Sequence, residues 1–242
     1  LSLHDALPIL LPVSARAAAQ APSKMGFKPG TTVTVDNALK MLMVKSANDV
    51  AFVLAEGVSG SVEQYAEDMN ATSRRLGMTQ SHWVNPNGLP AEEQITSARD
   101  LAILGRAMVR DFPEYLHYWN IPAIKFGKKV MRNTNSLIGR YNGADGGKTG
   151  FICASGFNVM ASATRNGRRL NALVDQANKL AKPNGQRVVR KLVAIHVHAD
   201  ARVVSALVGK PFGMIFVKID VGVDVHFRCL SGHGSADGDV MC

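Results

Sequence analysis

Three adjacent residues, Lys148, Thr149 and Gly150, combine a cation, a hydroxyl group and a position without a side chain. The residues that follow, 154–163, alternate small or polar with mostly bulkier side chains, a pattern typical of a β-strand. At a strand, a Lys can meet a carboxylate, a Thr hydroxyl can hydrogen-bond to it, and a Gly lets a ligand backbone come close. The segment therefore predicts a ligand-binding strand, with an edge strand as one option, although Lys-Thr-Gly is commonly just a solvated strand start.

A hairpin is predicted directly after this segment. Asn166 and Gly167 separate the first apolar run from a second one over 172–174. Asn-Gly between two such runs is the strongest short-range signal for a β-hairpin. The Lys-Thr-Gly tripeptide is therefore expected on or beside one strand of an antiparallel sheet.

A phosphate-binding loop is the main rival, because Gly147, Lys148 and Thr149 match the end of that motif. The motif requires Gly, four residues and then Gly-Lys-Ser/Thr, and Asn142 occupies the position of its first Gly. A phosphate loop must also open a helix, whose N-terminal amides hold the phosphates, whereas a hairpin is predicted here. The nucleotide-binding interpretation is therefore excluded.

A second polar pair, Ser46 and Asn48, interrupts a helical pattern about a hundred residues earlier. Thr34 can cap a helix over Val35–Lys45, and a second apolar helix is predicted to end at Gly57. The simplest interpretation of the pair is a helix–loop–helix corner in which both residues are ordinary caps. That interpretation explains the residue types but not their combination with a later Lys-Thr-Gly strand.

The remaining elements predict helices first and strands afterwards. A helix is expected from Ser61, which starts a capping box, to Gly77, and another helix is expected after the N-cap Ser97. A hairpin is expected over 121–132. The predicted fold class is therefore α/β of the α+β type, in which a helical lobe lies beside an antiparallel sheet.

Length and charge narrow the possible partners. The 242 residues can bury ample core in one large or two small domains. A net charge of +9 suits an anionic partner such as a wall polymer, whereas scattered basic residues without a nucleic-acid signature argue against DNA or RNA. No run of about 18 apolar residues is present, and the cysteines lack metal-like spacing. We predict no metal and no cofactor, and the sequence does not indicate how the protein would attach to a membrane.

Both ends of the chain are unusual. Residues 1–14 are interpreted as a non-native or adapter-like leader, because residue 1 is not Met and the apolar stretch lacks the basic flank of a signal peptide. Residues 15–170 form the main predicted domain, and 171–242 form a divergent tail that a frame shift would explain. Ser, His and Asp gather at 231–239, but the members of a catalytic triad are brought together by the fold rather than by adjacency.

Together, the two motifs resemble those of the penicillin-binding serine D-alanyl-D-alanine carboxypeptidases of peptidase family S11. The resemblance covers roughly residues 15–170 and implies a truncated transpeptidase-like catalytic domain with an incomplete β-lactamase/transpeptidase-like fold. The segments that carry it stand in family order: PSKMGFKPG from Pro22, KSAND from Lys45, NPNGL from Asn85, SARDL from Ser97 and GADGGKTG from Gly143.

The resemblance also implies a role for each residue. Ser46 would relay a proton towards the leaving group, and Asn48 would hydrogen-bond to the substrate backbone. Lys148 would hold the carboxylate of the terminal D-alanine, with Thr149 assisting and Gly150 giving room. The implied chemistry is acyl transfer through a Ser ester on peptidoglycan pentapeptides, with β-lactams as further ligands and the periplasm or cell envelope as location.

One part of the family pattern is missing. In such enzymes the nucleophile is the Ser of a Ser-x-x-Lys motif, and no Ser in this chain has Lys three residues later. We expect this motif to lie before residue 1 and this chain to be inactive, with backbone amides at 152–154 as the candidate oxyanion donors. The alternative is a non-catalytic peptidoglycan-binding module of the same fold, and a plain structural or interaction protein is the third option.

Overall fold

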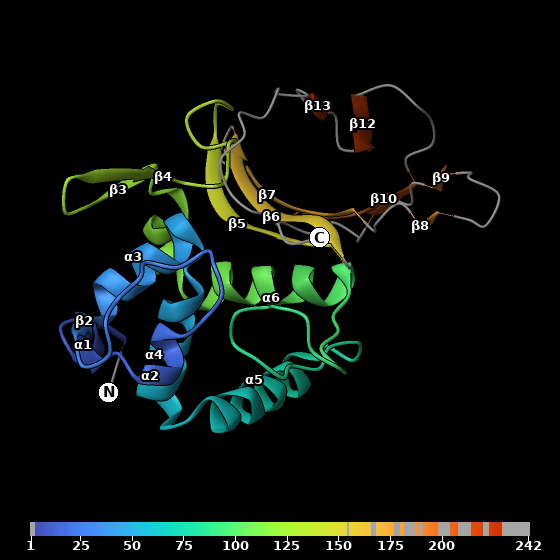
Figure 1. Ribbon diagram of the computed structural model, residues 1–242. Helices are drawn as coiled ribbons and strands as arrows, with labels where there is room; N and C mark the ends of the chain where they lie inside the picture. Colours follow the sequence, from blue (N-terminus) through green and yellow to red (C-terminus); the bar gives the residue numbers. More distant parts are fainter. Residues whose placement is uncertain are drawn as a thin grey trace.

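A helical lobe lies beside an antiparallel sheet in this protein (Figure 1), which confirms the predicted fold class. The computed structural model describes residues 3–153, 155–165, 168–176, 180–181, 187–188, 191–197, 204–207, 214–219 and 223–228. The helical elements come first along the chain: α1 (Leu3–Ala6), α2 (Ala15–Ala18), α3 (Val35–Lys45), α4 (Asn48–Ser59), α5 (Val62–Leu76), α6 (Ala98–Asp111) and the 3₁₀-helix η1 (Pro113–Asn120).

The strands form one five-stranded sheet and several two-stranded ones. The main sheet has the order β11-β10-β7-β6-β5, and the smaller pairs are β1-β2, β3-β4, β8-β9 and β12-β13. Their bounds are β1 (Leu10–Pro12), β2 (Thr32–Thr34), β3 (Ala123–Phe126), β4 (Lys129–Arg132), β5 (Ala144–Ile152), β6 (Gly156–Arg165), β7 (Arg168–Gln176), β8 (Leu180–Ala181), β9 (Arg187–Val188), β10 (Lys191–Val197), β11 (Val204–Leu207), β12 (Met214–Ile219) and β13 (Val223–Arg228).

Helix starts follow the predicted capping residues. The hydroxyls of Thr34, Ser61 and Ser97 each accept a hydrogen bond from the backbone N–H three residues later. Such bonds satisfy N–H groups that have no partner inside the helix. At the far end of α5, Gly77 adopts the left-handed conformation that ends many helices. The predictions for α3, α5 and the start of α6 are therefore confirmed.

The predicted end of α4 at Gly57 is wrong. The helix continues to Ser59, and Gly60 is the left-handed residue that ends it. Gly57 has a packing role instead, because a Cβ atom at this position would lie 2.6 Å from Cδ2 of Leu11. The missing side chain lets β1 pack closely against the helix.

The core of the helical lobe is built around α4. Val50, Val53 and Ala55 are fully buried, and the helix packs against α2, α3, α5 and β1. A helix with buried residues on most of its surface lies inside its lobe rather than at the surface. This packing fixes the corner between α3 and α4, where Ser46 and Asn48 lie.

The predicted hairpins are present as paired strands. Antiparallel β6 and β7 pair Arg165 with Arg168, and the predicted Asn166-Gly167 turn lies outside the described residues. Strands β3 and β4 pair in the same way. Strand β5 pairs with β6 and stands at one end of the main sheet. The Lys-Thr-Gly tripeptide therefore lies on an edge strand of the described sheet.

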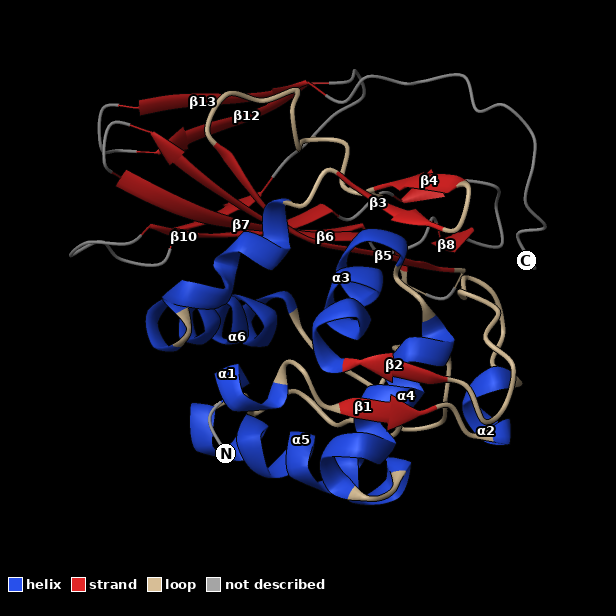
Figure 2. Ribbon diagram, turned by 90° about the vertical axis from the view of Figure 1, so that its left-hand side faces the viewer, coloured by secondary structure: helices blue, strands red, loops and turns tan. Residues whose placement is uncertain are grey.

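Helix α6 joins the two parts of the molecule. It runs beneath the main sheet in Figure 1 and contacts β6, β7 and β10. The view in Figure 2 shows the same layers, with the sheet above α6 and the lobe. Gly105 of α6 faces Met160 of β6, and a Cβ atom at Gly105 would lie 2.8 Å from the Met160 sulfur. The glycine therefore permits close contact between helix and sheet.

The ends of the predicted main domain remain a prediction from the sequence. Within the leader, Leu10–Pro12 pair with β2 and Val13 is buried. At the other boundary, β7 continues past residue 170 to Gln176. In the part of the chain that the structure describes, no helix combines the length and apolar character needed to cross a membrane.

Gly146 provides a test of how β5 is held. Its φ of +105° is rare for residues with a side chain, and a Cβ atom there would collide with the backbone carbonyl of Trp119 in η1. We expect Gly146→Ala to lower the free energy of unfolding by about 2 kcal/mol or more, measured by urea denaturation. Gly150→Ala is the control on the same strand, because no atom lies within 4 Å of its Cβ position, and it should change stability by less than about 0.5 kcal/mol. Equal effects of the two substitutions would contradict this packing.

Candidate active site

Ser46 and Lys148 meet although they are 102 positions apart in the sequence. The Lys148 Nζ donates a hydrogen bond of 2.8 Å to the Ser46 Oγ. Ser46 ends α3 in the helical lobe, and Lys148 lies on the edge strand β5. The structure therefore brings the two motifs to one site, while the catalytic role of each residue stays a prediction.

The backbone of Ser46 positions its hydroxyl. Ser46 is the C-cap of α3 in the left-handed conformation, with φ 56° and ψ 45°, and its N–H donates to the Leu42 carbonyl at 3.0 Å. Left-handed backbone is uncommon for residues with a side chain and persists where surrounding structure holds it. The conformation turns the chain from α3 into α4 within two residues.

The Lys148 ammonium is half-buried, and its hydrogen-bond acceptors among the described residues are neutral. Besides Ser46 Oγ, its Nζ donates to the carbonyl oxygen of Thr149 at 2.5 Å. Among the described residues no Asp or Glu forms an ion pair with it. Burial lowers the pKa of the ammonium to about 8 because desolvation disfavours the charged form. A half-buried ammonium is stabilised by an anionic ligand, because the ligand supplies a counter-charge in place of lost water.

The other two residues of the tripeptide are more accessible towards the end of β5: Thr149 is half-buried and Gly150 is exposed. The hydroxyls of Thr149 and Thr134 lie 2.7 Å apart and share a hydrogen bond. Gly150 is exposed, with no heavy atom within 4 Å of the position that a Cβ would take. The strand, together with Thr134 beside it, therefore offers a ligand an ammonium, a hydroxyl pair and unobstructed backbone at Gly150.

Asn48 is near the site in sequence, but its side chain has a structural partner. The residue is buried, and its Nδ2 donates to the Ala21 carbonyl at 3.0 Å while its backbone N–H donates to the Ser23 carbonyl at 2.7 Å. These bonds hold the segment before β2 against the α3–α4 corner. The predicted hydrogen bond from Asn48 to a substrate stays a prediction.

Asp49 is a residue that the sequence interpretation missed. It is fully buried, and its carboxylate accepts hydrogen bonds from the backbone N–H groups of Met25, Gly26 and Val50 at 2.9–3.0 Å. A carboxylate with several N–H donors is well satisfied at the start of a helix. The position of Asp49 in the first turn of α4 was a sequence signal that its carboxylate interacts with backbone N–H groups. Its partners in the 21–26 segment could not be predicted from spacing.

The candidate oxyanion region is described in part. Ile152 is the last residue of β5, and Ala154 lies outside the described residues. The proposed role of the 152–154 amides therefore remains a prediction.

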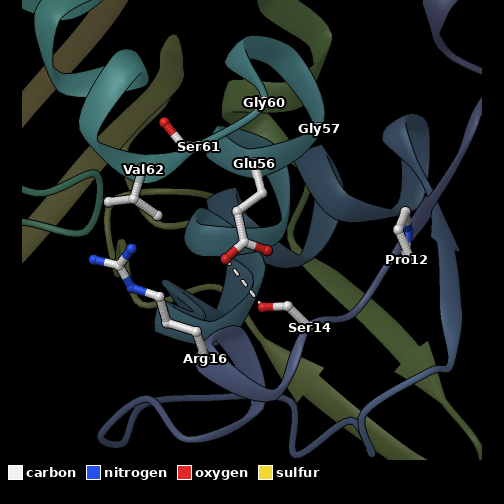
Figure 3. A pocket seen from close by; sticks show the side chains of 8 residues that line it. All are labelled: Pro12, Ser14, Arg16, Glu56, Gly57, Gly60, Ser61 and Val62. Carbon is white, nitrogen blue, oxygen red and sulfur yellow. Dashed lines mark hydrogen bonds between the residues drawn. The ribbon is translucent and has the colours of Figure 1, made fainter.

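An open pocket elsewhere in the lobe provides a comparison. It has a volume of about 410 Å³ and is lined by Pro12, Ser14, Arg16, Glu56, Gly57, Gly60, Ser61 and Val62 (Figure 3). Its polar groups already pair with protein: Ser14 Oγ donates to Glu56 at 3.0 Å, and Arg16 forms an ion pair with Glu63 at 2.8 Å. We therefore place the candidate site at Ser46 and Lys148, where the cation has no ionic partner among the described residues.

Residues 7–179 match the family described as D-alanyl-D-alanine carboxypeptidase, peptidase S11. The chain belongs to this family.

Individual relatives agree with the assignment. The chain is 37% identical over 153 residues to the D-alanyl-D-alanine carboxypeptidase DacC of Escherichia coli strain K12, an alignment that covers 63% of this chain and 38% of DacC. The structure is similar to penicillin-binding protein 6B from Escherichia coli, with TM-score 0.67, 25% identity and coverage of 85% and 81% of the two chains. It is also similar to cefotaxime-bound penicillin-binding protein D2 from Listeria monocytogenes, with TM-score 0.62, 26% identity and coverage of 71% and 70%. The chain thus spans about two fifths of the length of this curated relative.

The lowered pKa of Lys148 predicts a pH dependence of stability. Between about pH 8 and the ordinary Lys value of 10.5, the unfolded chain retains a proton that the folded chain has released. The free energy of unfolding should therefore rise with pH in this window, by at most about 1.4 kcal/mol per pH unit for one proton. Urea denaturation of the wild type and Lys148→Met at several pH values measures it. If the free energy of unfolding changes equally in the wild type and Lys148→Met between about pH 8 and 10.5, this prediction is wrong.

Proposed function

We propose that the Ser46–Lys148 site binds the D-alanyl-D-alanine end of a peptidoglycan stem peptide, as in a serine-type D-alanyl-D-alanine carboxypeptidase. The observation that carries the proposal is the Lys148 ammonium at an open edge strand, hydrogen-bonded to Ser46 and without an ionic partner among the described residues. A terminal carboxylate supplies that charge. Membership of the peptidase S11 family supports the choice of peptide.

Each residue has a role in this proposal. Lys148 holds the terminal carboxylate, Thr149 donates its hydroxyl to it, and Gly150 leaves room for the peptide backbone beside β5. Peptide backbones bind exposed sheet edges through main-chain hydrogen bonds, and the exposure of Gly150 supports this mode. Where the nucleophile is also present, Ser46 would relay a proton to the leaving amine, for which its contact with Lys148 is suited, and Asn48 would contact the substrate backbone.

The reaction is acyl transfer in two steps. An activated Ser attacks the peptide carbonyl, an ester forms and D-alanine leaves, and water then releases the shortened peptide. The attack requires the Ser-x-x-Lys motif, which the 242 residues do not contain. We therefore propose that this chain binds the peptide without cleaving it. A non-catalytic peptidoglycan-binding module would bind in the same way, and only the gene upstream distinguishes the two.

The location and further ligands follow from the proposal. The peptide substrate belongs to the cell wall, so the protein acts in the periplasm or cell envelope. The net charge of +9 suits contact with anionic wall polymers. The cefotaxime held by the Listeria monocytogenes relative supports β-lactams as ligands of the same site.

Peptide binding tests the proposal directly. Isothermal titration with diacetyl-L-lysyl-D-alanyl-D-alanine should show binding by the wild type, and Lys148→Met should weaken it by about tenfold or more because a hydrogen bond to a charged group is lost. Lys125→Met is the matched control, since Lys125 is exposed on β3 and its loss changes the net charge equally. The absence of wild-type binding, or equal losses in both variants, would contradict the proposal.

The inactivity of this chain has its own test. Incubation with labelled penicillin should give no covalent adduct by mass spectrometry, and the peptide should release no D-alanine. The control is a protein of the family that contains Ser-x-x-Lys. A stoichiometric adduct on any Ser, including Ser46 beside Lys148, would overturn the claim that the nucleophile is missing.

A further inference from the structure

A second hydroxyl lies beside the proposed carboxylate site. Thr134, in the segment between β4 and β5, is exposed, and its Oγ1 lies 2.7 Å from the Oγ1 of Thr149. Neither motif in the sequence includes this residue. Its position at the Lys-Thr-Gly strand raises the question of what the paired hydroxyls do.

The backbone around Thr134 is held on both sides. Its own N–H donates to the Val44 carbonyl at 3.3 Å, so the segment is attached to α3 two residues before Ser46. The neighbouring Asn133 donates from Nδ2 to the Ile121 carbonyl at 2.9 Å and accepts from the Asn135 N–H at 2.8 Å. These bonds fix the backbone from which the Thr134 side chain reaches Thr149, so little backbone freedom is left to lose when a ligand binds.

The hydrogen bond between the two hydroxyls leaves one O–H available to donate to a ligand. At 2.7 Å one O–H of the pair donates to the other oxygen, so the remaining O–H points elsewhere and can donate to a ligand. If Thr134 donates to Thr149, the Thr149 O–H is free to donate to a ligand that Lys148 also holds. A carboxylate accepts from both, whereas a carboxamide has one acceptor oxygen and an NH₂ group that itself donates.

We propose that Thr134 is a positioning residue of the carboxylate-binding site, and that it directs the Thr149 hydroxyl so that the site selects a free terminal carboxylate over a terminal amide. This inference rests on the proposed function, since it specifies how the same site recognises the end of its peptide. Thr134 acts through Thr149 and is not a catalytic residue.

The experiment measures the ratio of affinities for two peptides. Diacetyl-L-lysyl-D-alanyl-D-alanine and its C-terminal amide are titrated against the wild type, Thr134→Val, Thr134→Ser and the control Thr32→Val, an exposed β2 residue. Thr134→Val should reduce the preference for the carboxylate by about two- to tenfold, the loss expected for one hydrogen bond. Thr134→Ser restores the hydroxyl and should keep the preference, as should Thr32→Val. Thr134→Ala replaces the Val variant if that protein does not fold.

Two different results would overturn the inference. A wild-type preference that persists in Thr134→Val and Thr134→Ala shows that Thr134 does not direct the site, while the proposed function stands. A wild type that does not bind the carboxylate peptide, or binds the amide equally well, refutes both the inference and the proposed function. A parallel loss of affinity for both peptides in the Val and Ala variants indicates a structural role only and also overturns the inference.

Discussion

The hydrogen bond between the Lys148 ammonium and the Ser46 hydroxyl connects the sheet to the helical lobe at the candidate site. A half-buried ammonium without a carboxylate partner is costly unless polar groups surround it. Ser46 supplies one such group only because α3 ends in a left-handed residue that turns the hydroxyl towards β5. Because Ser46 makes the burial of the Lys148 ammonium tolerable, the cation is already positioned and partly desolvated for binding an anion. The interaction thus links the stability of the interface to the binding chemistry that we propose.

Glycines let the layers around this bond approach closely. Gly57 allows β1 to pack on α4, Gly105 allows β6 to pack on α6, and Gly146 allows β5 to lie against η1. At each place a side chain would meet a neighbouring atom closer than atoms normally approach. The buried carboxylate of Asp49 then fixes the 21–26 segment against the corner that carries Ser46. Close packing at the glycines and the hydrogen bonds of Asp49 therefore determine the position of the candidate site together with the Ser46–Lys148 bond.

Local signals predicted the local structure well, and long-range packing was beyond them. Thr34 and Ser61 cap helices as expected because their bonds reach only three residues along the chain. Gly57 was misassigned because the same residue type ends helices and permits close packing, and only the tertiary neighbour Leu11 distinguishes the two. The family resemblance was what assigned both motifs to one site. Spacing could not predict that Ser46 and Lys148 meet, because no spacing rule connects residues 102 positions apart. The partner of Thr149, Thr134, was missed for the same reason.

The central claim is that the ammonium of Lys148 receives the terminal carboxylate of a D-alanyl-D-alanine peptide. A crystal structure of this chain with diacetyl-L-lysyl-D-alanyl-D-alanine tests it most directly. The account predicts intact peptide alongside β5, with carboxylate oxygens about 2.7–3.2 Å from the Lys148 Nζ and the Thr149 Oγ1. Peptide bound with its carboxylate at Arg16 in the pocket of Figure 3, or anywhere out of reach of Lys148, would contradict the account.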